Sequence, residues 1–247
     1  MSATVDVLNP KQPKQIAILA SNPSISKQTG WPIGFWWSEL THPYWAFSEH
    51  GYKVDIYSPL GGKLEADNWS DPRDESKYSA DDLISLGFIS SPLHSTLVEN
   101  SRPIHDLKCA AYDAILIVGG QGPMYTFYQD ERVHDVAAEF YKAGKITAVL
   151  CHATCILLQT KVDGNLLVRG KTWTGFANSE ERYADEFVGK RIQPFWIEEE
   201  AKKLPETNFI VDRRFKPHAV RDGNLITGQQ QYSGTAVARL VVEALGV

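Results

Sequence analysis

A thiol and an imidazole stand next to each other at Cys151 and His152, inside the stretch ITAVLCHATCILL. A β-branched apolar run precedes the pair and a second apolar run follows it, which predicts a buried strand turning into a helix at this point. Ligands of open α/β sheets bind beyond the carboxyl ends of the strands. The first amides of the helix would stabilise a thiolate and lower the cysteine pKa from ~8.5 toward ~4 to 7. Cys151 is therefore predicted to be an ionised nucleophile.

Structural interpretations of the same cysteines stay open. Cys151 could be a small buried apolar residue and His152 a packed imidazole, as such residues often are. Cys155 and Cys109 are predicted to be core residues. Three cysteines without a C-x-x-C pair argue against a disulfide framework and against a structural zinc site, and the histidines lack ligand spacing. No metal and no cofactor is predicted.

The elements that must position this pair are alternating strands and helices. Short β-rich apolar runs predict strands, and the segments between them have helical character. The predicted strands are residues 15–21, 53–59, 112–120 and 146–152, and the main helices between them are 34–51 and 130–144. This alternation implies right-handed crossovers and a parallel sheet covered on both faces. The predicted fold class is α/β, a flavodoxin-like, doubly wound parallel sheet sandwiched by helices.

A single domain is predicted for residues 1–247, because no Gly/Ser/Pro linker divides the chain. Residues 1–14 are interpreted as an N-terminal arm. Residues 60–108, rich in turn formers and charge, are predicted to be an insertion over one edge of the sheet. The remaining predicted elements are a helix at 179–189, a strand at 208–212, a hairpin with an Asp-Gly turn at 218–228 and a closing helix at 233–247.

Composition excludes several classes of function. The net charge is −5 and the pI is near 5.8, with Lys and Arg scattered, so the chain has no electrostatic footprint for nucleic acid or an anionic membrane. The N-terminus lacks a signal-peptide pattern, and no apolar run approaches the ~18 residues of a membrane span. A cytoplasmic protein that binds neither nucleic acid nor membranes is expected.

Three stretches, AVLCHAT, ILIVGGQGPMYTF and GFWWSELTHPYWAF, together carry a family resemblance. With them, residues 15–245 resemble the ThiJ/PfpI superfamily of class I glutamine amidotransferase-like proteins, especially its heat-shock chaperone and glyoxalase III branch. The most specific features of the resemblance are a Cys-His pair at the elbow, a Gly-Gly after the preceding strand, and a Glu followed closely by Pro in the first helix. This sequence supplies Cys151-His152, Gly119-Gly120 and Glu39 with Pro43.

The resemblance implies a catalytic set of Cys151, His152, Glu39 and Glu181. Glu39 would contact the sulfur and act as general acid and base. Glu181 would orient His152, with Glu180 as the alternative. The amides of Gly120 and His152 would form an oxyanion site. The competing interpretations are an exposed acid on an amphipathic helix, a turn glycine and a solvated helix start.

Departures from the family pattern leave the substrate open. Gln121 stands where the branch commonly has His, and Ala153 stands where Gly is usual. True glutaminases of this fold use a late His-x-Glu motif, whereas His218 is followed by Ala219 and Val220, which disfavours glutamine hydrolysis.

The leading hypothesis by this resemblance is a cofactor-independent cysteine enzyme acting on a small reactive carbonyl in stress or detoxification. Its specific case is glyoxalase III-type conversion of methylglyoxal to lactate, in which Cys151 adds to the aldehyde and Glu39 moves the proton between adjacent carbons. One alternative is a redox-sensing holdase whose aromatic stretch at residues 34–47 binds unfolded chains. Another is an amidase or peptidase. A homodimer is expected from the resemblance alone.

Overall fold

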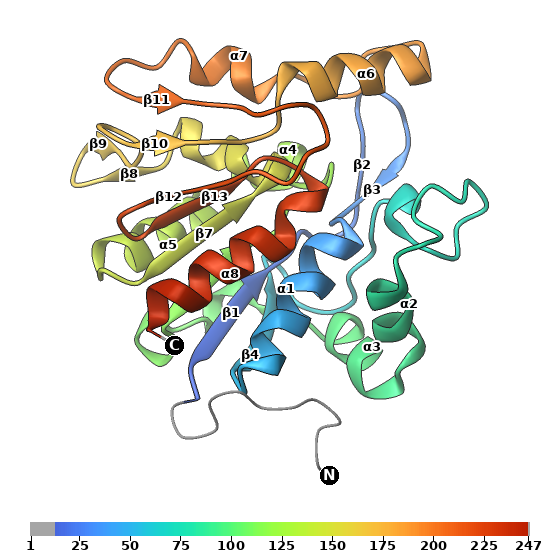
Figure 1. Ribbon diagram of the computed structural model, residues 1–247, viewed down its shortest axis with the longest axis horizontal. Coiled ribbons are helices and arrows are strands. Elements are labelled where there is room, and N and C mark those ends of the chain that lie inside the picture. Colours follow the sequence, from blue (N-terminus) through green and yellow to red (C-terminus); the bar gives the residue numbers. More distant parts are fainter. Residues whose placement is uncertain (1–12, 247) are drawn as a thin grey trace.

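Seven strands form one sheet in the order β12-β13-β7-β6-β1-β4-β5 in the computed structural model, which describes residues 13–246 (Figure 1). All neighbouring strands are parallel except β12 and β13, which pair antiparallel. The strands are β1 Gln15–Leu19, β4 Lys53–Ser58, β5 Arg102–Pro103, β6 Ala114–Ile117, β7 Ile146–Leu150, β12 Ala219–Asp222 and β13 Leu225–Gly228. The predicted α/β class is confirmed. Most of the predicted N-terminal arm, residues 1–12, lies outside the described residues.

Helices cover both faces of this sheet. Helix α1 (Trp37–Glu49) packs beside α8 (Gly234–Leu245) on one face, and α5 (Glu131–Lys142) packs on β6 and β7 from the other (Figure 1). Because both faces are covered, β6 and β7 are buried along their whole length, and their sequences are apolar except for Thr147 rather than alternating. The sandwich predicted from the alternation of elements is present.

The segment 60–108 lies over the β4 edge of the sheet, as predicted. Its two main helices are α2 (Leu83–Ser90) and α3 (Pro92–Glu99), and its short strand β5 pairs with β4 and so covers that edge. Helix α2 packs against α1, and an Asp82 side chain caps its first turn. The insertion therefore contacts the helix that carries Glu39.

The C-terminal part adds elements beyond the end of the sheet. Figure 1 places α6 (Asn178–Val188) and α7 (Ile197–Ala201) together above the strands. The predicted hairpin is confirmed as β12–β13, with Gly223 at φ +66° in its turn. Helix α7 was not predicted, because its five residues are too few for a periodic pattern.

Other short elements were also not predicted. They are β2 (Ser24–Ile25), β3 (Pro32–Ile33), α4 (Pro123–Thr126), β8 (Lys161–Val162), β9 (Asn165–Leu166), β10 (Thr172–Trp173) and single-turn 3₁₀ helices at Asn68–Ser70, Ile104–Asp106, Cys109–Ala111 and Gln231–Ser233. The remaining short strand is β11 (Asn208–Phe209). Strand β11 falls inside the strand predicted at 208–212. Among the helices of residues 13–246, none combines the length and the apolar character needed to cross a membrane.

The aromatic stretch at residues 34–47 is mostly core. Phe35 and Phe47 are fully buried and Trp37 is 7% exposed, whereas Trp45 is 41% exposed. These rings pack between α1, the sheet and α2. The stretch therefore does not form the exposed aromatic surface that the holdase alternative requires.

Candidate active site

Cys151 occupies a strained turn between β7 and the helix that follows. Its φ angle is +58°, which non-glycine residues rarely adopt. The chain then continues as a 3₁₀ helix, Cys151–Leu158, rather than the α-helix expected from the sequence. A sharp, strained turn at the end of a central strand is typical of a nucleophile elbow. This turn places Cys151 at the wall of a pocket. Cys155 and Cys109 are buried core residues, as predicted.

Two glycines after β6 allow the backbone to approach this turn. A side chain on Gly119 would place its Cβ 2.8 Å from the Glu39 carboxyl and 2.9 Å from the Cys151 Cβ. Gly120 has φ +99°, and a Cβ there would lie 2.6 Å from the carbonyl oxygen of Gly34. The Gly119 amide donates to Glu39 at 2.7 Å, while the amides of Gly120 and His152 hydrogen-bond the sulfur. A side chain at position 119 or 120 would block this close approach of the backbone, so both positions need glycine.

Glu39 is fully buried in the first turn of α1, so the interpretation as an exposed helix acid is wrong. Its carboxyl faces the Cys151 thiol. Burial raises the pKa of Glu39 to about 8, against the opposing hydrogen bonds from the thiol and from the Gly119 amide. The Gly119 amide bonds Glu39 Oε2, and Glu39 Oε1 is buried without a hydrogen-bond partner among the described residues. At neutral pH this carboxyl therefore carries a proton and can donate it toward the sulfur.

The expectation of a lowered cysteine pKa is wrong for this site. Burial raises the pKa of the Cys151 thiol well above its usual value, and the neighbouring Glu39 charge raises it further. The amides of His152 and Gly120 act in the opposite direction but do not outweigh burial. Cys151 and Glu39 therefore form one coupled pair, in which loss of the first proton leaves a single negative charge shared between sulfur and carboxyl.

The rate of Cys151 alkylation by iodoacetamide is expected to rise with pH through about 8, where the Glu39 pKa lies. Below that pH both members of the pair hold their protons, and above it one charge becomes available to the sulfur. Mass spectrometry of each cysteine-containing peptide, labelled from about pH 6 to about pH 9, measures this rate. A rate already at its plateau at the acid end would contradict the protonated pair.

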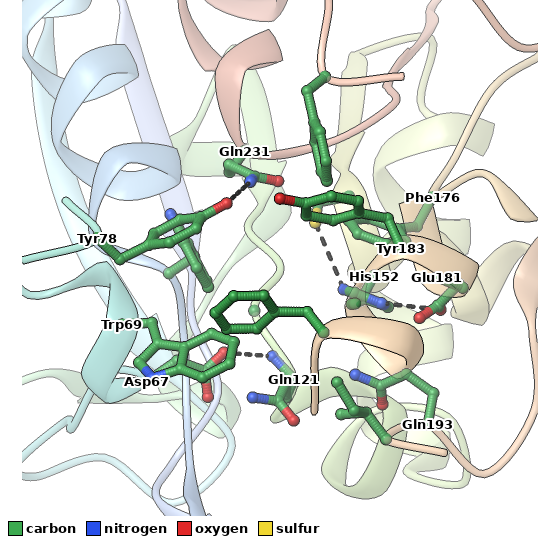
Figure 2. Close-up of a pocket in the computed structure, with 17 residues that line it drawn as sticks. Asp67, Trp69, Tyr78, Gln121, His152, Phe176, Glu181, Tyr183, Gln193 and Gln231 are labelled. Atoms are coloured by element: carbon green, nitrogen blue, oxygen red, sulfur yellow. Dashed lines mark hydrogen bonds and ion pairs between the residues drawn. The ribbon is translucent and has the colours of Figure 1, made fainter. Parts of the chain in front are cut away.

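His152 links the sulfur to a buried carboxylate. Its Nδ1 lies 3.5 Å from Cys151 Sγ, and its Nε2 lies 3.0 Å from Glu181 Oε1, the ion pair drawn between the two labelled residues in Figure 2. Phe176 stacks on the imidazole with ring centroids 3.9 Å apart. His152 is 6% exposed and Glu181 is 1% exposed. The imidazole is thus held in one orientation by a ring and a carboxylate.

Glu180 and Glu181 have different partners, although they are adjacent on α6. The Glu180 carboxylate accepts the Phe215 amide and the Gln229 side chain at 2.9 Å each, and the Ala177 amide at 3.0 Å. Glu180 therefore ties three segments together and does not hydrogen-bond His152. Glu180 is fully buried and Glu181 nearly so, and neither belongs to a solvated helix start.

Asp67 is a site residue that the sequence analysis missed. Its two carboxyl oxygens accept the Gly34 amide at 3.0 Å and the Gln121 amide at 2.6 Å. Burial raises its pKa to about 7. It fixes the loop that follows Gly120 and so positions one of the two amides at the sulfur. Nothing in the local sequence, a loop rich in turn formers and charge, distinguishes this acid from its solvated neighbours.

A pocket of about 220 Å³ opens over the pair of Cys151 and His152. Most of its wall is aromatic or apolar, and polar side chains are spaced around it: Asp67, Gln121, His152, Glu181, Gln193 and Gln231 (Figure 2). Its aromatic lining consists of Trp36, Trp69, Tyr78, Phe176, Tyr183, Phe187 and Phe215. In the part of the chain that the structure describes, no group of three or more His, Cys, Asp or Glu side chains could hold a metal ion.

These features define a class of protein: a doubly wound α/β fold whose central strand ends in a cysteine elbow flanked by an acid, a histidine and two glycines. Residues 34–244 match the model of the DJ-1/PfpI family, and the chain belongs to that family. The resemblance inferred from the motifs is thereby confirmed.

Known relatives cover nearly the whole chain. Glutathione-independent glyoxalase HSP31 of Saccharomyces cerevisiae is 25% identical over 94% of this chain and 98% of its own length. Two solved structures have the same fold. The Rapid Encystment Protein of Francisella tularensis has a TM-score of 0.83 at 24% identity, over 95% of this chain and 100% of that one. Glyoxalase III of Candida albicans has a TM-score of 0.78 at 20% identity, over 94% and 97%.

Proposed function

We propose that this protein is a glutathione-independent glyoxalase that converts small 2-oxoaldehydes to 2-hydroxy acids, with methylglyoxal giving lactate. The observation that carries the proposal is the Glu39 carboxyl, buried and protonated at neutral pH against the Cys151 thiol at the edge of the pocket. A nucleophile and a proton carrier at one carbon are what this internal redox reaction requires. Relatives named as glutathione-independent glyoxalases support it.

The first half of the reaction forms a covalent intermediate. The reaction starts from the pair after loss of its first proton, with the negative charge on the sulfur of Cys151 and the remaining proton on Glu39. The sulfur adds to the aldehyde carbon C1, and the carbonyl oxygen takes the proton of Glu39, which gives a hemithioacetal. The amides of Gly120 and His152 stabilise the oxygen while its charge develops. Glu39, now a carboxylate, removes the C1 hydrogen as a proton, and the released electron pair forms an enediolate between C1 and C2.

The second half moves the proton and releases the acid. Glu39 returns its proton to C2, and the hydroxyl hydrogen on C1 passes to the C2 oxygen, so that C1 becomes a thioester. C1 is oxidised by two electrons and C2 is reduced by two, and the step needs no external redox partner. Water, deprotonated by His152, attacks the thioester and breaks the carbon–sulfur bond. The 2-hydroxy acid leaves, and the proton taken from water restores the pair of Cys151 and Glu39.

The charge of the pocket supports a neutral substrate. Asp67 and Glu181 are its acidic residues, and no Lys or Arg is among the described residues that line it. A substrate carboxylate would meet negative charge without a cationic partner in an apolar pocket, which is unfavourable. An uncharged oxoaldehyde avoids this cost. The same argument disfavours amidase or peptidase action on carboxylate-bearing substrates.

Purified protein incubated with methylglyoxal, without glutathione, tests the proposal. We expect formation of lactate in step with loss of methylglyoxal, measured by an enzymatic lactate assay. Loss of methylglyoxal without lactate would mean chemical modification of the protein rather than turnover. Absence of lactate over repeated preparations would reject the proposal, and suppression of client aggregation in its place would favour the holdase.

The Glu181→Gln variant is expected to lower the rate of lactate formation by about 10²-fold, because a neutral amide orients and stabilises the imidazolium less well. The matched variant is Glu180→Gln, one residue away. It should lower the melting temperature, because in either orientation of the new amide its NH₂ would face a donor, the Ala177 amide on one side or those of Phe215 and Gln229 on the other. Kinetics and thermal melts of both variants separate the two roles. Loss of melting temperature with an unchanged rate at Glu181→Gln would contradict its positioning of His152.

We further propose that the chain folds as a single domain and forms a homodimer. We also propose that the protein is cytoplasmic and binds neither nucleic acid nor membranes. The return of α8 to pack beside α1 supports the single domain, since the two ends of the described chain share one layer. Sedimentation velocity at micromolar concentration tests the dimer.

A further inference from the structure

The pocket is larger and more aromatic than methylglyoxal needs. Its volume of about 220 Å³ exceeds the ~150 Å³ of an apolar cavity that holds one benzene molecule. A phenyl ring together with the two-carbon oxoaldehyde group therefore fits the space. Methylglyoxal, which carries only a methyl group beside its two carbonyls, would leave much of the aromatic wall uncovered.

Six rings of the pocket wall form a continuous contact series. Neighbouring rings lie 5.3 to 6.5 Å apart between centroids, in edge-to-face and stacked arrangements. The order is Trp36, Tyr78, Trp69, Phe187, Tyr183 and Phe215. Such an array offers ring edges and faces to a further ring at the preferred spacing of aromatic pairs.

Several of these rings are left exposed at the pocket. Phe187 is 69% exposed, Tyr78 is 44% exposed and Tyr183 is 40% exposed. Large exposed aromatic side chains that gather around a cavity indicate a ligand-binding site. Tyr78 comes from the insertion at the β4 edge, and Tyr183 and Phe187 come from α6 above the strands, so these rings surround the position of a substrate's side group rather than its reacting carbons.

Two carboxamides of the same pocket hold unused hydrogen-bonding atoms. Gln193 is 1% exposed, and the Oε1 atoms of Gln193 and Gln121 are buried without a hydrogen-bond partner among the described residues. In the view of Figure 2 both lie on the side of the pocket opposite Gln231, whose side chain bonds the Tyr78 hydroxyl at 3.4 Å. A buried unpartnered acceptor is costly until a ligand supplies a donor.

We propose that the preferred substrate is an aromatic 2-oxoaldehyde whose ring carries a hydroxyl group, bound with the ring among the six aromatic side chains and the hydroxyl at Gln121 and Gln193. This rests on the proposed glyoxalase function and names its substrate class. A hydroxyl donates one hydrogen bond and also accepts, so it can donate to the Oε1 of one carboxamide and accept from the NH₂ of the other. Gln121, the departure from the family's usual His, thereby gains a role in specificity. The chemistry at C1 and C2 is unchanged, and the product is an aryl 2-hydroxy acid.

The first test compares methylglyoxal, phenylglyoxal and 4-hydroxyphenylglyoxal on the wild-type protein, with Cys151→Ala as the blank for chemical loss of substrate. We expect kcat/KM to rise at least about tenfold from methyl to phenyl, from burial of the ring. It should rise again by roughly 3- to 10-fold with the hydroxyl. Equal or better turnover of methylglyoxal would overturn the inference and leave the proposed function standing.

The second test removes a carboxamide. Gln193→Met keeps the size of the side chain, and we expect it to bring the ratio of kcat/KM for 4-hydroxyphenylglyoxal over phenylglyoxal close to one. The control is Gln159→Met, an exposed glutamine after the 3₁₀ helix, which should leave that ratio unchanged. An unchanged ratio in folded Gln193→Met would overturn the hydroxyl assignment.

A binding experiment separates this inference from the catalytic proposal. Trp36 and Trp69 line the pocket, so a bound ring should quench tryptophan fluorescence. On Cys151→Ala, 4-hydroxyacetophenone should quench saturably and more tightly than acetophenone. If no oxoaldehyde is turned over, the glyoxalase proposal fails, and saturable quenching still supports the aromatic site. Absence of saturable quenching by both ketones would overturn it.

Discussion

Cys151→Ala is expected to reduce lactate formation from methylglyoxal by at least about 10⁴-fold, to the level of the blank. The proposed reaction passes through two intermediates bonded to the sulfur, and none of the surrounding groups can replace it. Cys155 lies deeper on the same 3₁₀ helix and is fully buried, with its sulfur directed at the Pro123 carbonyl. It cannot reach a substrate in the pocket.

Cys109→Ala is the matched control for this prediction. Cys109 is also a buried thiol, but it precedes β6 and does not line the pocket over Cys151. Its removal should leave turnover unchanged, even if it lowers the melting temperature. Retention of more than a few per cent of wild-type lactate formation by Cys151→Ala would exclude covalent catalysis at this sulfur. The pocket residues would then have to catalyse the proton transfer alone.

The fold was largely predictable because its elements have strong local signals. The buried strands β1, β6 and β7 are nearly continuous apolar runs, and α5 opens with acids and ends with Lys142. Short elements such as α7 and β5 were missed, because two to five residues hold too little periodicity. Their conformation is set by neighbours distant in sequence, which a single sequence does not reveal.

The site residues were predictable where reactive residue types lie next to one another, or at the end of a predicted strand, in the sequence itself. Cys151 and His152 are adjacent, and Gly120 follows a strand directly, so the sequence alone points to them. The pairing of Glu181 rather than Glu180 with His152 depends on which face of α6 turns inward, and the sequence left both open. Asp67 comes from a loop in the insertion, and only the fold brings it to the elbow.

The ionisation state of the thiol was the main error of the sequence analysis. The amides at the start of a helix favour a thiolate, and the sequence gives no measure of the opposing cost of burial. In the structure Cys151 is 2% exposed and faces a buried carboxyl, so burial dominates. A protonated Glu39 carboxyl beside the sulfur carries no charge, so it does not raise the thiol pKa beyond the effect of burial. It also supplies a proton to the alkoxide that forms when the sulfur adds to the substrate.

Glu39→Gln is expected to change two measurements in opposite directions. Lactate formation should fall by about 10² to 10⁴-fold, because an amide cannot carry the proton from C1 to C2. Alkylation of Cys151 above about pH 8 should become faster, since the substitution removes the charge that Glu39 carries there, which is the second largest cause of the raised thiol pKa. The glutamine keeps the size of the protonated acid and an oxygen to accept the Gly119 amide, so the fold should be retained.

Opposite changes distinguish this role from simple damage, because a distorted site would lose turnover without a more reactive thiol. Glu199→Gln, on the exposed face of α7, is the control and should change neither rate. Lactate kinetics and the pH profile of labelling of Cys151 decide the outcome. If Glu39→Gln labels more slowly and still forms lactate within about tenfold of wild type, the carboxyl is a structural support for the elbow, and the proton must move through His152 instead.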